Sequence, residues 1–168
     1  LFQDINEYNN FSFLQDVLPK LYKLKTLKFS PSYLNGYDFE ETLELLVYHD
    51  LEDFKMDDIG FESVNCMIEN TGGHLRKLST NFFEYEDKES LILIGTIYKK
   101  CPLIEYLSLE FPITRDHFIE FERLLKNCQK LKVLLLSVSD DDDKMNVNEL
   151  LRILIRSAPM NLREIRLD

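Results

Sequence analysis

One short pattern, LxxLxL, recurs along the chain and constrains the fold more than any other feature. Its six copies read LKTLKF, LEDFKM, LRKLST, IEYLSL, LKVLLL and LREIRL, and they begin at residues 24, 51, 75, 104, 131 and 162. The steps between neighbouring copies are therefore 27, 24, 29, 27 and 31 residues. The end of each copy alternates in the way that is typical of a short β-strand with one buried face. We therefore expect six similar units that stack on one another.

Between the copies, apolar residues follow a helical spacing instead. Recurrence every three or four residues predicts helices across 91–101, 118–128 and 147–155. The apolar positions that predict them are Leu91, Ile94, Ile97, Tyr98 and Cys101, then Phe118, Phe121, Leu124, Leu125 and Cys128, then Val147, Leu150, Leu151, Leu154 and Ile155. Each unit is therefore predicted to consist of a helix, a turn, a short strand and a loop.

Several residues predict where these helices begin and end. Asn146, followed three residues later by Glu149, resembles a capping box and predicts the start of the last helix. Pro102 and Pro159 are expected to end helices shortly before the next strand, because proline cannot continue a helix. The pair Gly72–Gly73 predicts a similar end in the third unit.

Such units bury their apolar sides only by stacking, which joins the strands into one parallel sheet and the helices into a second layer. The predicted class is α/β, with residues 1–168 forming a single domain. The repeat length, 24–31 residues, is close to that of leucine-rich repeats. We expect a leucine-rich-repeat solenoid of about six repeats, with the curved parallel sheet on its concave side and the helices on its convex side.

Composition excludes several classes of function. The net charge is −10, from 30 acidic and 20 basic residues, which disfavours nucleic acid because phosphate binding relies on Lys and Arg. Apolar runs do not approach the roughly 20 residues that a membrane helix needs, so we expect no membrane contact. The three cysteines show no CxxC spacing, which argues against a disulfide framework or a zinc site and favours a reducing compartment. We therefore expect an intracellular protein, cytoplasmic or nuclear.

The sequence resembles the leucine-rich-repeat region of F-box proteins. The pattern NCxxLxxLxL at Asn127–Leu136 and its relative CPxxxxLxL at Cys101–Leu109 resemble their cysteine-containing repeats. The stretch Ile113–Asp116 resembles the turn before the helix of such repeats. The segments TGGHLRKL and LLRILIRSAPMNLREI look similar to an expanded fungal family of F-box/LRR proteins. The resemblance covers roughly residues 11 to 168.

The resemblance implies a function. The chain would be the substrate-recognition part of an F-box subunit of a cullin-type ubiquitin ligase, with a protein substrate on the concave face. The ligase adaptor would bind an F-box that is not present in this chain and that would lie upstream of Leu1. We expect a fragment of a longer protein, with more repeats after Asp168 or with association through that edge. The alternative is a leucine-rich-repeat scaffold or effector binding module unconnected to ubiquitin.

One departure from the family concerns the residue after each strand, where such repeats usually carry Asn or Cys. This position is occupied instead by Ser32, Ile59, Phe83, Pro112 and Ser139. The sequence therefore predicts no ladder of asparagines along the stack.

Strand alternation predicts which side chains face a partner. If the leucines point inward, the residues between them lie on the concave face. Tyr106, Val133 and Leu135 would then form an apolar cluster on neighbouring strands, and tyrosine is enriched at binding hot spots. A flanking loop that covers the cluster is the alternative interpretation. The predicted partner-binding residues are Tyr106, Ser108, Val133, Leu135, Lys77, Lys55 and Arg166; the other members of the concave set are Thr26, Lys28, Ser30, Asp53, Asp57, Ser79, Asn81, Glu110, Ser137, Glu164 and Asp168.

Catalysis finds no support in the sequence, and we expect no enzyme and no cofactor. No GxSxG, phosphate-binding glycine loop or HExxH motif is present. The three histidines fall at unrelated positions in the repeat, with a surface or capping role expected for His74. Cys101 and Cys128 are expected in an apolar corner, where thiols are unreactive. A buried histidine beside a carboxylate in a cleft would revive the hypothesis of a hydrolase.

The acidic run Asp140–Lys144 invites a metal hypothesis. An EF-hand loop that starts at Asp140 would need Gly at 145 and Glu at 151, but Met145 and Leu151 stand there. We therefore expect no metal site. The run, together with Phe83–Glu89, is predicted to face a basic patch on a protein partner.

Overall fold

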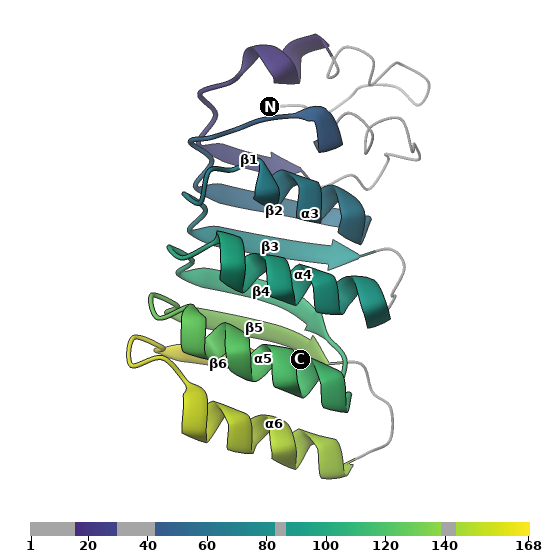
Figure 1. Cartoon of the computed structure of the whole chain (residues 1–168), viewed down its shortest axis with the longest axis vertical. Helices are drawn as coiled ribbons and strands as arrows, with labels where there is room; N and C mark the ends of the chain where they lie inside the picture. Colours follow the sequence, from purple (N-terminus) through teal and green to yellow (C-terminus); the bar gives the residue numbers. More distant parts are fainter. Residues whose placement is uncertain (1–15, 30–42, 83–86, 139–143) are drawn as a thin grey trace.

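The computed structural model describes residues 16–29, 43–82, 87–138 and 144–168. These residues form one sheet and one layer of helices (Figure 1). In chain order the elements are η1 (Leu18–Lys20), β1 (Thr26–Phe29), β2 (Asp53–Ile59), α3 (Phe61–Glu69), β3 (Lys77–Phe82), α4 (Asp87–Lys100), β4 (Tyr106–Phe111), α5 (Arg115–Asn127), β5 (Val133–Val138), α6 (Lys144–Ser157) and β6 (Glu164–Leu167).

The six strands form a parallel sheet in the order of the sequence, β1 to β6, so that every strand pairs with the next one along the chain. Helices α3 to α6 lie side by side on one face of this sheet (Figure 1). Each of these helices follows one strand and precedes the next, as parallel pairing requires. The predicted α/β class, with a parallel sheet and helices between the strands, is confirmed.

The register aligns the copies of the sequence pattern. One row across the sheet joins the fourth residue of every copy, which is Leu27, Phe54, Leu78, Leu107, Leu134 and Ile165. The first five members of this row are 6% exposed or less. Because side chains alternate along a strand, the next inward row follows two residues later and includes the buried Met56, Leu109 and Leu136. The predicted inward positions are therefore confirmed from Leu27 of β1 to Leu136 of β5. They are wrong for β6, where Ile165 and Leu167 are 42% and 39% exposed, because among the described residues no helix follows β6 to cover them.

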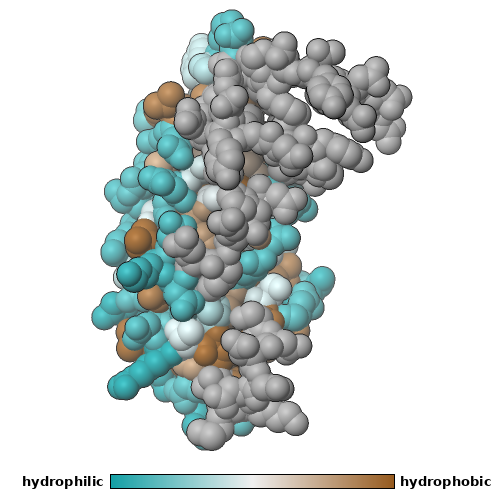
Figure 2. All heavy atoms as spheres, turned by 90° about the vertical axis from the view of Figure 1, so that its right-hand side faces the viewer, coloured by the Kyte–Doolittle hydropathy of each residue, from teal (hydrophilic) through white to brown (hydrophobic). Residues whose placement is uncertain are grey.

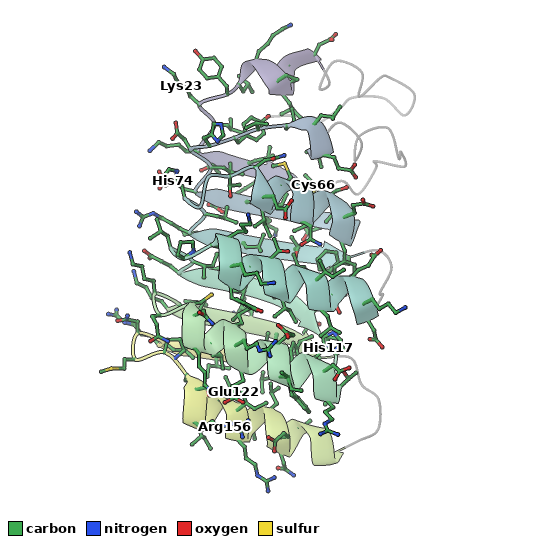
Figure 3. The ribbon with its side chains drawn as sticks, viewed as in Figure 1. Lys23, Cys66, His74, His117, Glu122 and Arg156 are labelled. Atoms are coloured by element: carbon green, nitrogen blue, oxygen red, sulfur yellow. The ribbon has the colours of Figure 1, made fainter. Side chains whose placement is uncertain are left out.

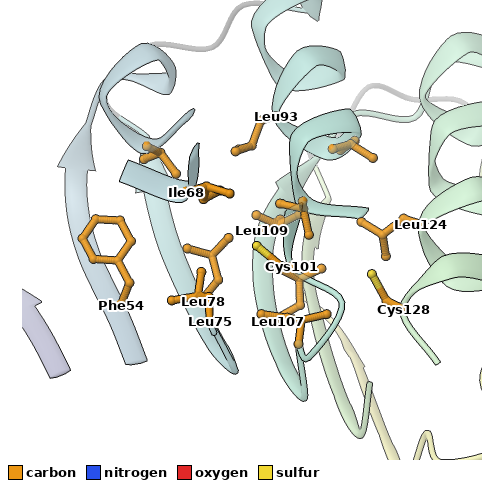
Figure 4. Close-up of a cluster of buried hydrophobic side chains, with 14 of the residues drawn as sticks. Phe54, Ile68, Leu75, Leu78, Leu93, Cys101, Leu107, Leu109, Leu124 and Cys128 are labelled. Atoms are coloured by element: carbon orange, nitrogen blue, oxygen red, sulfur yellow. The ribbon is translucent and has the colours of Figure 1, made fainter. Parts of the chain in front are cut away.

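The core lies between the sheet and the helices. Figure 4 shows Leu78, Leu107 and Leu109 of the strands facing Ile68, Leu93 and Leu124 of the helices. The predicted apolar positions of α5 are all buried, and those of α4 are buried or half-buried. Each buried Leu or Ile contributes roughly 1.5–3 kcal/mol relative to exposure, so this layer supplies the main driving force for stacking.

The apolar stripe predicted for α6 is only partly correct. Leu150 and Leu154 are buried, but Val147, Leu151 and Ile155 are 39%, 42% and 86% exposed. The buried face of α6 instead includes Ile153 and Ser157. Spacings of three and four residues define two adjacent stripes on one helix, and the sequence pattern does not distinguish the stripe facing the sheet from the stripe beside it.

The predicted start of α6 is wrong. The helix begins at Lys144, so Asn146 lies inside its first turn. A capping residue needs a non-helical backbone, and Asn146 is already helical. The motif marked the first turn of the helix but not its boundary.

The predicted helix ends are confirmed. Helix α4 ends at Lys100, before Pro102, and α6 ends at Ser157, before Pro159. Gly72 and Gly73 follow α3 with φ of 61° and 81°, a conformation that favours glycine. A Cβ at Gly72 would also lie 3.1 Å from the carbonyl oxygen of His49, so this turn packs closely against the preceding unit.

A charged cluster joins the last two helices. The carboxylate of Glu122 on α5 lies 2.6 Å from Nη2 of Arg156 on α6 and 2.7 Å from Nζ of Lys126 (Figure 3). Hydrogen bonds from Arg156 and then Lys126 lower the pKa of Glu122 to about 2. The pair therefore stays charged through the physiological range and links α5 to α6 at the surface.

Among the described residues, no helix combines the length and the apolar character needed to cross a membrane.

Two adjacent leucines test the register. Leu134→Ala removes a fully buried side chain and is expected to lower the free energy of unfolding by about 2–5 kcal/mol. Leu135→Ala removes a half-buried side chain from the other face and is expected to cost under about 1.5 kcal/mol, since little cavity forms. Urea unfolding monitored by circular dichroism measures both. Equal losses would contradict this register.

Candidate functional site

The face of the sheet that none of the described helices covers carries the predicted partner-binding residues, and we call it the open face. The register sets them in two rows that cross all six strands. The first row contains Thr26, Asp53, Lys77, Tyr106, Val133 and Glu164, and the second contains Lys28, Lys55, Ser79, Ser108, Leu135 and Arg166. All seven predicted site residues lie in these rows. Glu110 and Ser137 pair beyond them, and Ser30 lies outside the described residues.

The predicted apolar cluster exists as a set of adjacent residues. Tyr106 of β4 pairs with Val133 of β5, and Ser108 pairs with Leu135. Tyr106, Val133 and Leu135 are all half-buried. Together they form a partly exposed apolar surface on two neighbouring strands. A partner that covers this surface would remove the remaining area from water, which is the main driving force for association.

Charges surround this cluster. Lys28 pairs with Asp53 at 2.8 Å, Lys55 reaches Asp57 at 3.6 Å, and Arg166 pairs with Glu164 at 2.5 Å. Lys77 is exposed beside Tyr106 in the first row and has no ion-pair partner among the described residues. As far as the described residues go, the open face therefore offers an apolar centre with the exposed cation of Lys77 beside it.

A ladder of charges, alternating in sign over its first five members, runs along the edge where the strands begin. It consists of the second residue of each copy of the pattern, which is Lys25, Glu52, Arg76, Glu105, Lys132 and Arg163. Glu52 lies 2.8 Å from Lys25 and 3.6 Å from Arg76, whereas Glu105 lies 3.1 Å from Arg76 and 2.5 Å from Lys132.

The ladder lowers the pKa of both of its carboxylates. Hydrogen bonds from Lys25 and Lys132 lower the pKa of Glu52 and Glu105, respectively. Exposed pairs are worth little individually, but the opposite charges on the first five units, from Lys25 to Lys132, favour this order of stacking. Sequence reasoning missed the ladder, although the order K, E, R, E, K, R at one repeat position was visible.

His117 forms the densest polar contact in the described core. Its Nε2 lies 2.6 Å from Oγ of Ser90, and its Nδ1 lies 2.7 Å from Oγ1 of Thr114. Oγ of Ser90 also donates to the carbonyl oxygen of Asp87, and Thr114 caps α5 by accepting from the backbone N–H of His117. These partners suit the neutral ring, in which Nε2–H donates to Ser90 and Nδ1 accepts from Thr114. The contact joins the beginnings of α4 and α5.

The Ser90–His117 contact has the residue types of a hydrolytic dyad but not its surroundings. His117 is fully buried and Ser90 is 2% exposed, so a substrate would not reach either group. Nδ1 contacts a threonine hydroxyl, Oγ1 of Thr114. Burial lowers the pKa of His117, while the negative charges of Asp87 and Asp116 oppose that change. The arrangement therefore serves packing between α4 and α5.

The remaining candidate groups also behave as structural groups. Cys101 and Cys128 are fully buried, and burial raises the pKa of each thiol to about 12. Their predicted place in an apolar corner is confirmed (Figure 4). His74 is exposed, as predicted, with Nδ1 2.7 Å from the carbonyl oxygen of His49.

Two further predictions concern metal binding and the acidic loops. In the described part of the chain, no group of three His, Cys, Asp or Glu residues could hold a metal ion. The acidic residues 140–143 and residues 83–86 lie outside the described residues, so the predicted acidic edge stays a prediction.

Comparison with known proteins found no family model, no curated protein and no solved structure that matches this chain.

The buried His117 predicts a specific dependence of stability on pH. Because its pKa is lowered in the folded protein from the ordinary 6.5, the unfolded chain binds more protons below that pH. The free energy of unfolding should therefore fall as the pH drops below about 6.5. Urea unfolding at successive pH values measures this.

His117→Gln is the test variant, and His74→Gln at the exposed position is its matched control. The fall between about pH 6.5 and 5 should disappear in His117→Gln and persist in His74→Gln. A fall of the same size in both variants would contradict the assignment to His117.

Proposed function

We propose that this chain is a non-catalytic protein-interaction module of the leucine-rich-repeat type, whose open face binds another protein. The observation that carries the proposal is the pair of aligned rows on that face, with Tyr106, Val133 and Leu135 at their apolar centre. Six stacked units of similar length, with one strand each, support the repeat assignment. In such a solenoid the open face would be the concave side.

The chemistry of the open face indicates how a partner would bind. A segment that crosses the strands would meet Lys77, Tyr106 and Val133 in succession along the first row. Tyrosine offers a rigid apolar surface with a polar tip and is enriched among residues that dominate binding energy. Small hydroxyl residues beside it, Ser79 and Ser108, leave room for the side chains of a partner.

The resemblance to F-box/LRR proteins supports a more specific role. On this proposal the chain is the part of an F-box subunit that recruits substrates to a cullin-type ubiquitin ligase. The ligase adaptor would bind an F-box outside these 168 residues. This step rests on the cysteine-containing repeats at Asn127–Leu136 and Cys101–Leu109 and on the analogy that they carry.

A leucine-rich-repeat scaffold unconnected to ubiquitin is the second candidate. The observation that favours it is the position where such repeats usually carry Asn or Cys after the strand. Pro112 follows β4 there, and Ile59 is instead the last, buried residue of β2. The same open face would bind the partner, so the two candidates differ in the proteins that accompany it and not in the site.

The proposal that the module is non-catalytic is supported by the burial of two of its three cysteines and of the Ser90–His117 contact. Cys101, Cys128 and the Ser90–His117 contact are all inside the core. The high pKa values of the two thiols keep them protonated near neutral pH.

Affinity capture from a cell extract tests the function and the face together. The bait is the full-length parent protein, either wild type or with Tyr106, Val133 and Leu135 changed to Ser. We expect both forms to retain ligase adaptor and cullin subunits, and the variant to lose its other partners at least about tenfold, as hot-spot removal typically does. Quantitative mass spectrometry of the captured proteins measures this.

A matched control changes three exposed apolar residues away from the open face, Leu45, Ile155 and Met160, to Ser. This control should keep the wild-type list of partners. Capture without any ligase subunit would favour the scaffold. A list that is unchanged in the open-face variant would place the binding site elsewhere.

A further inference from the structure

One edge of the molecule is formed by the turns that lead from each helix into the next strand. Figure 3 shows Lys23 and His74, which belong to two of these turns, on this edge. Together with the last two residues of the preceding helix, the turns of the last three units cover residues 99–105, 126–132 and 156–163. All three segments belong to the part of the chain that the structure describes.

These three segments are strongly basic although the chain as a whole is acidic. They contain seven basic residues and one acidic residue, whereas the whole chain contains 20 basic and 30 acidic residues. Their net charge is therefore +6, and that of the rest of the chain is −16. We call the seven basic residues the basic patch, which consists of Lys99, Lys100, Lys126, Lys130, Lys132, Arg156 and Arg163.

The basic patch is continuous because its three turns belong to neighbouring units. Strands β4, β5 and β6 pair in that order. The side-chain amide of Asn161 donates to the carbonyl oxygen of Gln129 at 2.9 Å, which joins the last two turns directly. Neighbouring strands lie about 4.8 Å apart, so the three strand starts span about 10 Å. Six residues of the patch are exposed, and Lys132 is half-buried.

The nearby carboxylates do not neutralise the patch. Glu105 and Glu122 are each already shared between two basic residues. In the described part of the chain, the side chains of Lys100, Lys130 and Arg163 form no ion pair. One exposed cation therefore stands free on each of the three turns.

Helix dipoles do not account for the whole patch. Basic residues often lie at the end of a helix because they complement its free carbonyl groups. At the end of α5, however, the side-chain amides of Asn127 and Gln129 donate to three carbonyl oxygens. Lys130 and Arg163 lie outside the helices, three and six residues after the last helical residue. Their charges are therefore available to another molecule.

An apolar side chain stands among these cations. Met160 lies in the turn before β6, three residues before Arg163, and is 100% exposed. Methionine is unbranched and polarisable, so it adapts to irregular apolar surfaces. The patch therefore offers one apolar contact beside its free charges.

The charge of the rest of the molecule decides which anionic partner fits. Acidic residues lie in the first turns of α3, α4 and α5, at the opposite edge of the sheet. Figure 2 views the molecule from that edge, where hydrophilic side chains surround separate apolar patches. Nucleic acid or an anionic membrane is large enough to meet this negative charge as well. Electrostatic interactions are screened over about 8 Å at physiological salt, so a short anionic segment meets only the patch.

We propose that the basic patch binds a short acidic segment of a partner protein. The segment crosses the turns before β4, β5 and β6 in an extended conformation, with carboxylates that face Lys100, Lys130 and Arg163. An apolar side chain of the segment packs against Met160. Carboxylates on alternate residues of an extended chain lie about 7 Å apart, so three of them span about 13 Å. This length lies between the spacing of the strand starts and the wider spacing of the helix ends.

The test uses a designed peptide, fluorescence anisotropy and NMR. The probe is a blocked, labelled peptide with Asp at alternate positions, Ser between them and one Leu at its centre. The control peptide carries Asn in place of every Asp. We expect the probe to bind at least tenfold more tightly than the control and to shift the amide signals of Lys100, Lys130 and Arg163. The affinity should fall as salt is raised, because exposed charges are screened.

Variants of the protein assign the binding to the patch. Lys100→Glu, Lys130→Glu and Arg163→Glu together should abolish binding of the probe and should create binding of a peptide with Lys in place of Asp. Met160→Ser should weaken binding of the probe but leave unchanged the binding of a peptide with Ser in place of the central Leu.

The matched control reverses three exposed basic residues outside the patch, with Lys88→Glu, Arg115→Glu and Arg152→Glu together. It changes the net charge by the same amount and should keep the wild-type affinity for the probe. Both triple variants should keep the circular dichroism spectrum of the wild type, because every replaced side chain is exposed.

Four outcomes would overturn the proposal. The probe would bind no more tightly than its Asn control, or both triple variants would lose the probe equally, which would assign the effect to net charge. Single-stranded DNA or phosphatidylserine vesicles would bind more tightly than the probe, which would make the partner a nucleic acid or a membrane. The same amides would shift on raising the concentration of the protein alone, which would make the patch a contact between two copies. None of these outcomes bears on the open face, because the two surfaces share no residue.

Discussion

The structure depends on one backbone interaction that recurs between successive units. The carbonyl oxygen of the second residue of each copy accepts two N–H groups of the next copy, at 2.7–3.2 Å. Lys25, Glu52, Arg76, Glu105 and Lys132 supply these five acceptors. Because a slip of one residue would turn every side chain to the other face, these contacts fix which residues reach the core and which reach the open face.

Most of the fold could be predicted from the sequence because its main determinant is periodic. The alternation within LxxLxL predicted the inward row through Leu134 and the outward row through Leu135. Features that depend on a single neighbour were missed. His117 becomes buried because Ser90 and Thr114 meet it from α4 and from the start of α5. The exposed stripe of α6, with Ile155, depends on which side faces the sheet, and spacing alone does not specify that.

In the candidate site, too, the periodic features were predicted and the features that depend on individual neighbours were not. The register of the strands brought all seven predicted residues onto one face, since period and pairing determine their positions. The pocket between α4 and α5, whose lining includes Ile92, Gly95 and Ile119, was not predicted, because it depends on the distance between two helices. A glycine within a helical pattern was the signal in the sequence, but its meaning depends on what lies above it.

The register can be tested directly with paired cysteines on the open face. Ser108 and Leu135 are register partners on β4 and β5, so Ser108→Cys with Leu135→Cys places two thiols within the range that a disulfide bridges. The diagonal pair, Ser108→Cys with Val133→Cys, is offset by two residues. Mild oxidation followed by mass spectrometry should give an intrachain disulfide in the first pair and little in the second. Equal bridging of both pairs, or bridging of the diagonal pair alone, would contradict the register on which the open face and the buried leucines depend.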